Sequence, residues 1–336
     1  MPELFLPTSG GRVDAALTQF SVAYTQDASE FVHTRVFGSV AVEHQTDFYY
    51  TWPLKTFLQA AGEQAVPFGV EAPGGGASLS TDNYRCEIRR WKTDITPDVR
   101  KNIPNQIELD RADVDYTTGA LLIRNENIWA GKYFQSGVWA EDWTAVDTNP
   151  DPLLKQTVKW SNYTESDPAK DVSTLKLAIK RRTGKTPNVM TVSEEVHEIL
   201  KRHPLVLARY VNSGGSITRA QLANYFEVER YEVAGGIQVT SPDGAETVTT
   251  DFVLGNHFLL TYAPARPGLM TASAGMTFGW KGLTNLNDSG IYIVRTPLPQ
   301  LGVDGYGRPT ERIEAVMAHD MKLTGNSLGA FIADVL

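Results

Sequence analysis

The chain has 336 residues, of which 42% are hydrophobic and 21% are charged, and its formal net charge is −8. This length is sufficient for more than one hydrophobic core, and the composition is typical of a folded chain. The negative net charge argues against a protein that binds nucleic acid tightly, because tight binding depends on many contacts between cationic side chains and phosphates. A single cysteine, Cys86, excludes an intramolecular disulfide. The sequence has no apolar run of the roughly 20 residues that span a membrane, so we expect no membrane partner.

The first part of the chain predicts an arm followed by a long β-hairpin. Residues 1–37 mix small, polar and scattered apolar residues without a period, which indicates an extended N-terminal arm. Residues 38–95 are predicted to form the hairpin, whose two strands alternate in polarity, with apolar residues at Val40, Val42, Phe48, Tyr50 and Trp52 and at Tyr84, Cys86 and Ile88. A ribbon of this length is marginal alone in water, so we expect it to need a further surface, which another subunit can supply. The side chains predicted to contact a neighbour are Phe48, Tyr50, Trp52, Phe57, Leu58 and Phe68.

A long helix is predicted over residues 105–134, within a first domain that covers residues 96–189. Val114, Leu121 and Ile128 recur every seven residues and form an apolar stripe. Asn105 and Glu108 have the spacing of a capping box. An ordinary core helix that is interrupted or kinked near Gly119 remains open as an alternative.

The rest of the chain predicts a second, mixed domain over residues 190–305. A helix is expected between the cap Asp167 and the terminating Gly184, just before this domain. Further caps are expected at Ser193 and Thr218, and the stretches after residue 226 indicate strands broken by Gly and Pro. Residues 306–336 end in apolar side chains, and we expect them to return to the first domain.

Several motifs resemble catalytic, phosphate-binding or metal-binding sites, but each of them lacks a residue or a context that such a site requires. His197–Glu198 begins like a metalloprotease helix, but Lys201 stands where the second histidine belongs. Gly184–Lys185–Thr186 ends like a phosphate loop but follows a predicted helix rather than a strand. Ser273 lacks the leading glycine of a nucleophile elbow. We therefore expect no enzyme, cofactor or metal.

One basic cluster remains on the helix that ends at Gly184. It consists of Lys176, Lys180, Arg181, Arg182 and Lys185, which either form a solvated helix face or contact nucleic acid. The pattern alone favours the solvated face, because cations near a helix C-terminus also complement the helix dipole.

The order of these pieces resembles that of the major capsid proteins of tailed bacteriophages, which share the α+β Johnson fold. The resemblance rests on seven stretches. They are VFGSVAVEHQTDFYYTW (36–52), DNYRCEIRRWKTDITPDVRKNIP (82–104), ALLIRNENIWAGKYF (120–134), DPAKDVSTLKLAIKRRTGKTPNVMTVSEEVHEILKRHPLVLARY (167–210), SITRAQLANYFEVERYEV (216–233), GNHFLLTYAP…SAGMTFGW (255–280) and GNSLGAFIADVL (325–336). It covers about residues 30–336. It implies an N-terminal arm (1–37), an extended hairpin loop (38–95), a peripheral domain (96–189) with a spine helix (105–134), an axial domain (190–305) and a C-terminal return (306–336).

The resemblance implies a shell protein that assembles as hexamers and pentamers into an icosahedral head around double-stranded DNA. Portal and scaffolding proteins are then expected partners, the virion is the expected location, and assembly is expected in the host cytoplasm. Lys176, Lys180 and Arg181 would line the lumen and touch DNA weakly. Two alternatives remain, which are an encapsulin-like bacterial compartment and an unrelated β-rich enzyme or binding protein.

Overall fold

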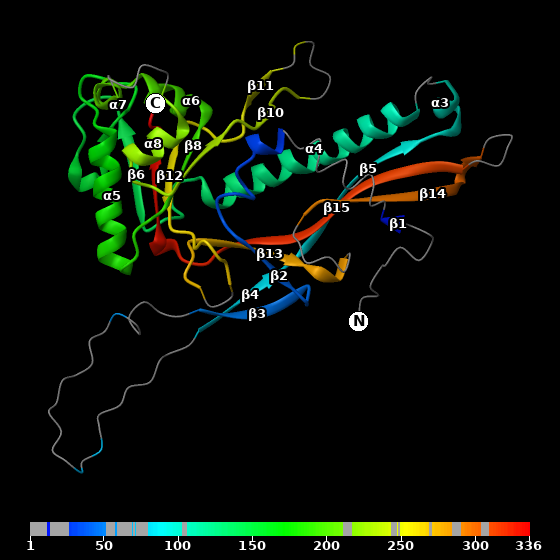
Figure 1. The fold of residues 1–336 in the computed structure, drawn as a ribbon, viewed down its shortest axis with the longest axis horizontal. Coiled ribbons are helices and arrows are strands. Elements are labelled where there is room, and N and C mark those ends of the chain that lie inside the picture. Colours follow the sequence, from blue (N-terminus) through cyan, green and yellow to red (C-terminus); the bar gives the residue numbers. More distant parts are fainter. Residues whose placement is uncertain are drawn as a thin grey trace.

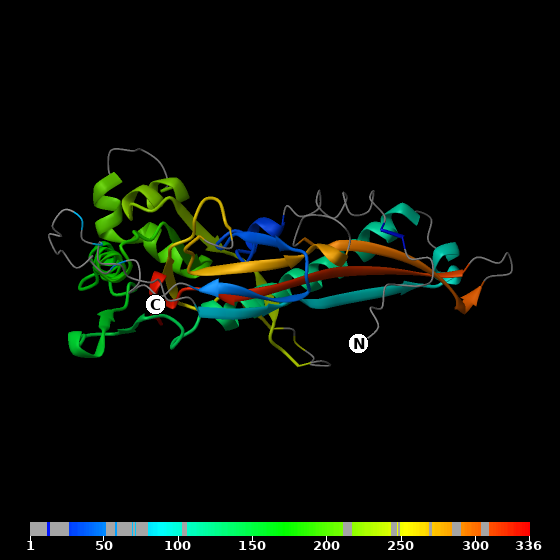
Figure 2. The same cartoon turned by 90° about the horizontal axis from the view of Figure 1, so that it is seen from below.

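The computed structural model describes residues 12–13, 27–51, 80–102, 106–210, 217–242, 249–268, 271–283, 290–303 and 309–336, and the single positions 58, 69, 71 and 247. The molecule is elongated and has two lobes (Figure 1, Figure 2). One lobe is a long sheet with the helix α4 along one face, and the other is a second sheet packed against shorter helices. Within the described residues, no helix is both long and apolar enough to cross a membrane.

The helix α4 runs over Gln106–Tyr133, close to the predicted range, and a short helix α3 (Pro97–Asn102) precedes it. It continues through Gly119 without interruption. Val114 and Leu121 are buried against the long sheet, while Trp129 and Tyr133 are buried near the second lobe. One apolar stripe therefore serves both lobes. Asn105, the expected helix cap, lies outside the described residues.

The long sheet is built around β15 (Pro309–Leu323), a strand of 15 residues. Along one edge, β15 pairs first with β14 (Tyr292–Val303) and then with β13 (Gly275–Trp280). Along its other edge it pairs with β5 (Glu87–Ile95). The short β2 (Ser39–Val42) lies parallel to β13, and β1 (Arg12–Val13) pairs with β14. A strand that is paired on both edges along most of its length can anchor elements from distant parts of the chain.

The predicted hairpin is broken into separate strands, and its paired part is shorter than expected. The expected first strand bends at residues 43–45 into β2 and β3 (Thr46–Thr51), and the expected return strand divides into β4 (Ser80–Arg85) and β5. Only β3 and β4 pair with each other, with Thr51 opposite Ser80. The expectation of one continuous strand with Val40, Val42, Phe48 and Tyr50 on a single face is therefore wrong, because β2 and β5 pair with the long sheet instead.

The second sheet has six strands, in the order β7-β6-β16-β12-β8-β9. Their bounds are β7 (Gln156–Val158), β6 (Glu141–Val146), β16 (Gly329–Ala333), β12 (Phe258–Thr261), β8 (Val189–Ser193) and β9 (Arg230–Ala234). Buried side chains of α5 (Pro168–Thr183), α6 (Glu194–Arg202) and α8 (Arg219–Tyr225) pack on this sheet in one core. A short helix α7 (Pro204–Tyr210) follows α6, and a separate ribbon is formed by β10 (Ile237–Val239) and β11 (Thr250–Phe252).

The predicted helix ends in this lobe agree with the structure, since each rests on local side-chain chemistry. Asp167 accepts the N–H of Lys170 at the start of α5, and Gly184 ends that helix with φ 71°. Ser193 caps α6, and Thr218 with Gln221 forms the expected capping box of α8.

Membership of the two sheets differs from the division into domains predicted from the sequence. Residues 141–158, expected in the first domain, form strands of the second sheet. Residues 275–280 and 292–303, expected in the second domain, form β13 and β14 of the long sheet. The C-terminal segment serves both, because β15 lies beside α4 while β16 lies in the second sheet. The reason is that pairing joins strands far apart in sequence, which composition along the chain does not reveal.

Residues 31–37 link the two lobes through a buried carboxylate on α4. Glu126 is fully buried and accepts the N–H of Val32 (3.0 Å) and of His33 (3.0 Å). The His33 ring places Nδ1 2.8 Å from the same carboxylate. On the other side, Arg230 of β9 donates to the carbonyls of Arg35 (2.5 Å) and Val36 (3.3 Å). This segment therefore ties α4 to the second sheet.

We predict that Glu126→Ala lowers the free energy of unfolding by about 2–4 kcal/mol, because it leaves buried donors of residues 32–33 without an acceptor. Urea unfolding followed by tryptophan fluorescence measures this change. Glu227→Ala, which removes an exposed carboxylate, is the control. An equal, small effect of both variants would contradict the linking role of Glu126.

His319 on β15 is a buried histidine whose ring nitrogens have no hydrogen-bond partner among the described residues. Burial, with the nearby charges of Arg89 and of His33, lowers its pKa to about 3. The neutral ring is therefore the folded form, while the unfolded chain takes up a proton near the usual pKa of 6.5. The contribution of His319 to stability is complete above that pH and is lost as the pH falls.

We predict that His319→Leu weakens the pH dependence of stability by about 3 kcal/mol between about pH 6.5 and about pH 4, because the titrating group is gone. The measurement is urea unfolding at a series of pH values. His44→Leu, at an exposed position, provides the control. Parallel pH curves for wild type and His319→Leu would show that the buried ring is not responsible.

Candidate functional site

The β3–β4 ribbon presents large aromatic side chains to solvent. Phe48 is 70% exposed and Tyr50 is 58% exposed, and both lie on the same face of β3. Solvent-exposed aromatic side chains next to each other favour a contact with another molecule. Both were predicted as contact residues, and their contact with another subunit stays a prediction.

The opposite face of the ribbon is fixed on its own chain. Tyr49 and Tyr84 are buried, and their rings lie 5.2 Å and 4.7 Å from the ring of Phe278 on β13, measured between centroids. Tyr49 also donates a hydrogen bond to Asp82 (2.8 Å), and Asp320 of β15 accepts the N–H of Arg85 (3.1 Å). Burial raises the pKa of the Tyr49 hydroxyl, so this group stays a neutral donor. The root of the ribbon is therefore positioned by the long sheet.

The other predicted contact residues fall in the loop between β3 and β4. Trp52, Phe57 and Phe68 lie outside the described residues. Leu58 is exposed. Its Cδ2 atom lies 3.8 Å from the point where a side chain at position 184 would place its Cβ atom. Leu58 is therefore close to the C-terminal end of α5 in the same chain, which the sequence did not indicate.

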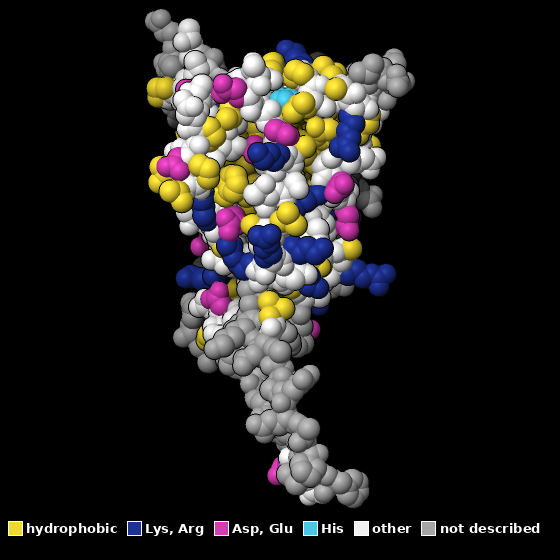
Figure 3. Space-filling model, turned by 90° about the vertical axis from the view of Figure 1, so that its left-hand side faces the viewer, with side chains coloured by type: hydrophobic (Ala, Val, Ile, Leu, Met, Phe, Trp, Pro, Cys, Tyr) yellow, Lys and Arg dark blue, Asp and Glu magenta, His cyan; other side chains and the backbone are white. Residues whose placement is uncertain are grey.

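The predicted basic cluster divides into two parts. Lys180 and Arg181 are exposed on α5. Lys176 is mostly buried, and its ammonium group donates to the carbonyls of Phe226 and Glu227 (2.7 Å to the latter). Burial lowers the pKa of Lys176. Its ammonium therefore holds the loop after α8 and does not extend the free basic face. Figure 3 shows Lys and Arg side chains gathered on the lower part of this end of the molecule.

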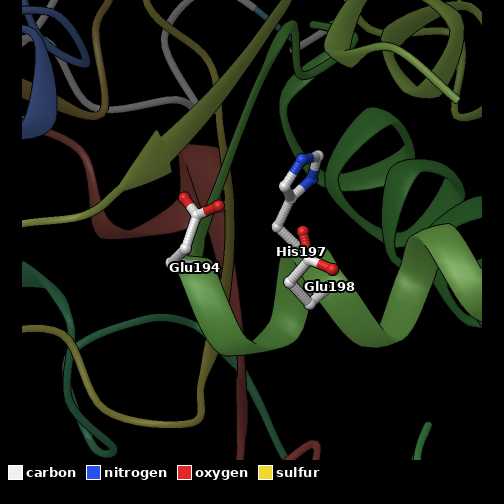
Figure 4. A group of neighbouring side chains, drawn as sticks. All are labelled: Glu194, His197 and Glu198. Carbon is white, nitrogen blue, oxygen red and sulfur yellow. The ribbon is translucent and has the colours of Figure 1, made fainter. Parts of the chain in front are cut away.

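A metal-like group occurs on α6, where Glu194, His197 and Glu198 bring possible ligand atoms within 4.8 Å of one another (Figure 4). The sequence motif points to His197 and Glu198, whereas Glu194 was interpreted with Glu195 as negative charge in the first turn of the helix. The spacing of three and four residues on a helix could have identified Glu194 as a third possible ligand. Each member already has a partner, namely Arg219 for Glu194 (3.6 Å), Tyr231 for His197 (3.0 Å) and Lys201 for Glu198 (2.6 Å).

The charges at this group oppose a cation. Two of the partners carry positive charge, and burial lowers the pKa of His197 to about 4. The neutral ring is fixed by the Tyr231 hydroxyl in a core contact. The group is best explained as a structural ion-pair and hydrogen-bond cluster.

The other two sequence motifs also have structural roles. Gly184 is the left-handed cap of α5, as expected, so Gly184–Lys185–Thr186 is the end of a helix and not the end of a phosphate loop. The hydroxyl of Ser273 is buried and donates to the carbonyl of Gly275 (2.6 Å).

The single cysteine is also buried. Burial raises the pKa of the Cys86 thiol to about 12, so the thiol remains protonated.

Exposed leucines on the second lobe were missed by the sequence analysis. They are Leu153 and Leu154, in a turn η2 (Pro152–Leu154) between β6 and β7, Leu177 on α5, and Leu205 and Leu207 on α7. The motif Asp-Pro-Leu-Leu indicates a turn, but only the structure shows that its leucines are uncovered.

Comparison with known proteins gives similarity to viral shell proteins over nearly the whole chain. No family model matches the sequence. The major capsid protein of Burkholderia phage BcepMu is 24% identical over 308 residues, which covers 84% of this chain and 90% of that protein.

Solved structures give the same result for the fold. A phage-related protein from Bordetella bronchiseptica RB50 has a TM-score of 0.68 with 19% identity, covering 97% of this chain and 98% of its own. The capsid of cyanophage P-SCSP1u has a TM-score of 0.55 with 9% identity, covering 98% and 93%. An encapsulin from Synechococcus elongatus PCC 7942 is also similar, with a TM-score of 0.50, 11% identity and coverages of 90% and 86%. The predicted α+β Johnson fold, and the resemblance on which it rested, are confirmed.

Proposed function

We propose that the chain is the major capsid protein of a tailed bacteriophage, and that its copies form the icosahedral head shell around double-stranded DNA. The observation that carries this function is the similarity to a phage major capsid protein along 84% of the chain. The common fold extends this similarity to almost the whole molecule. The role is structural, and the copies act as a homo-oligomer in which hexamers and pentamers are the building units.

The surface of the molecule supports assembly. The ribbon has one face anchored on its own sheet and another with exposed aromatic rings, which suits a segment that overlaps a neighbour. In a closed shell every copy has such neighbours, so no copy leaves this face in water. We further propose that the long-sheet lobe is the peripheral domain and that the second lobe is the axial domain.

The encapsulin-like compartment is the second candidate, because one solved encapsulin has the same fold. The similarity of sequence to a phage major capsid protein favours the phage shell. Nucleic acid inside purified particles distinguishes the two, since an encapsulin would enclose protein cargo. A β-rich enzyme is disfavoured, because the candidate catalytic side chains are engaged in structural contacts.

Further partners follow from the proposed function. Portal and scaffolding proteins would join the shell during assembly in the host cytoplasm, and the finished protein would reside in the virion. Contact with DNA would be weak and without sequence preference, through exposed cations such as Lys180 and Arg181.

The ribbon provides the test of this function. We predict that replacing residues 52–79 by Asn-Gly, which joins the paired residues Thr51 and Ser80, leaves a folded subunit that fails to form closed shells. Each loop side chain that is well buried on a neighbour contributes roughly 1.5–3 kcal/mol before ordering costs. Negative-stain microscopy of wild type and variant, with scaffold if required, shows assembly, and thermal unfolding shows whether the subunit is intact.

Two outcomes would contradict this account of the ribbon. Loss of folding in the variant would place the loop in the core of its own subunit. Normal shells from the variant would make the loop a dispensable surface feature. A wild-type protein that stays monomeric under all assembly conditions would count against the shell function itself.

We predict that Lys180→Gln with Arg181→Gln leaves shells intact but lets packaged DNA escape at a lower temperature in low salt, because two weak phosphate contacts are lost. A fluorescent DNA dye measures release during heating. Arg90→Gln with Lys92→Gln, which removes the same charge from β5, is the matched control. Equal release temperatures for both double variants would favour a solvated helix face.

A further inference from the structure

A polar layer interrupts the apolar contact between α4 and β15, which lie along each other (Figure 1). Met317 of β15 packs in one apolar cluster with Leu121 of α4, and Met321 packs in another with Trp129. His319 lies between the two methionines on the same face of the strand, because side chains two residues apart point the same way. A buried polar ring therefore stands where the two apolar clusters meet.

The neighbouring contacts place His319 opposite one turn of α4. The Nδ2 atom of Asn125 lies 2.9 Å from Sδ of Met317, and the ammonium group of Lys132 donates to the carbonyl of Met321 (2.6 Å). Between these contacts the helix rises by roughly 10 Å and the strand by about 13 Å, so the two elements run side by side. His319 is midway along this part of the strand, and it therefore lies opposite the helical turn between Asn125 and Lys132.

The imidazole ring of His319 has unpaired polar atoms. Its side chain is only 3% exposed, and neither Nδ1 nor Nε2 has a hydrogen-bond partner among the described residues. A neutral imidazole carries one N–H donor and one acceptor nitrogen. A buried donor or acceptor that stays unpaired loses the hydrogen bonds it makes with water in the unfolded chain, which is unfavourable. The ring therefore needs a partner that the described side chains do not supply.

Three polar groups of the same kind lie along α4. The Oδ1 atom of Asn125, the indole Nε1 of Trp129 and the hydroxyl of Tyr133 are buried and have no hydrogen-bond partner among the described residues. These residues are spaced by four, so they lie on one face of the helix, and Asn125 shows that this face is turned to β15. The set contains an acceptor, a donor and a hydroxyl that can do both.

The strands on either side of His319 do not offer a partner to its ring. On β13 the opposite residue is Gly279, which has no side chain to fill the space beside the ring. On β5 the opposite residue is Glu87, which is exposed and pairs with Arg89 (2.6 Å). The space next to the imidazole is thus bounded by a glycine on one side and by an ion pair that points to solvent on the other.

Water matches these groups better than an ion does. Within the part of the chain that the structure describes, the one group with ligand atoms close enough for a metal ion lies on α6. The buried carboxylate of Glu126 lies on the same turn of α4, which disfavours an anion, and its oxygens already accept from residues 32–33. Water both donates and accepts, and a buried water typically makes about three hydrogen bonds to polar groups that are otherwise unpaired.

We propose that ordered water is bound between α4 and β15, where it joins the imidazole of His319 to at least one of the three unpaired polar groups of α4. The bound water completes the hydrogen bonds of the polar layer that separates the two apolar clusters. The site belongs to the folded subunit, so this inference goes beyond the proposed function and does not depend on it.

A structure of the full-length protein, as crystals of the subunit or as particles, tests the site at a resolution that shows ordered water. We expect density for a water within roughly 2.7–3.2 Å of a ring nitrogen of His319 and of Asn125 Oδ1, Trp129 Nε1 or the Tyr133 hydroxyl. Any other arrangement around the ring, whether direct protein partners on both nitrogens or no density at all, would overturn the proposal.

Two substitutions at His319 give an independent measurement. His319→Gln keeps a donor and an acceptor for water, whereas His319→Leu has neither. At about pH 8, where histidine is neutral, His319→Gln should unfold at a higher urea concentration than His319→Leu. A dry site would give the reverse order, because the amide would be buried without partners. His44→Gln and His44→Leu, at an exposed position, are the controls and should unfold at the same urea concentration. Equal midpoints for the two His319 variants, or the reverse order, would overturn the proposal.

Discussion

The packing of α4 along β15 is the contact on which the rest of the molecule depends. Val114 and Leu121 of the helix are buried against Ile313 and Met317 of the strand. The strand then carries partners on both edges, so the long sheet is assembled around it. At its far end α4 buries Trp129 and Tyr133 among residues of the second lobe. A single helix and a single strand thus set the distance between the two lobes.

Much of the fold was predictable wherever short-range chemistry decides it. The caps at Asp167, Ser193 and Thr218 each follow from a side-chain oxygen that accepts a nearby backbone N–H. The length of α4 followed from its apolar repeat. The division of the hairpin into separate strands was not predictable. The alternation of polar and apolar residues looks the same whether β2 continues the pairing of β3 with β4 or pairs with β13. The choice of partner is a long-range property.

The candidate site shows the same division. The sequence identified Phe48 and Tyr50 as strand residues on one face, and the structure finds both exposed. It could not show that Lys176 uses its ammonium group within the chain, because its carbonyl partners at residues 226 and 227 lie some fifty positions away. Rejection of the metalloprotease motif needed only the missing histidine. Only the structure shows that Arg219 and Lys201 pair with Glu194 and Glu198 and neutralise their charges.

The strands β15 and β16 pair with partners that lie far away in the sequence. In the pairing of β15 with β5, residues 311–319 lie beside residues 87–95, and in the pairing of β16 with β6, residues 330–333 lie beside residues 141–144. Both strands lie inside their sheets, so neither sheet is complete before these distant segments have met. Contacts between residues far apart in sequence cost loop-closure entropy before they form, and folding slows where such contacts dominate. We therefore expect the chain to fold slowly and to leave strand edges open to wrong pairing until β15 and β16 are in place.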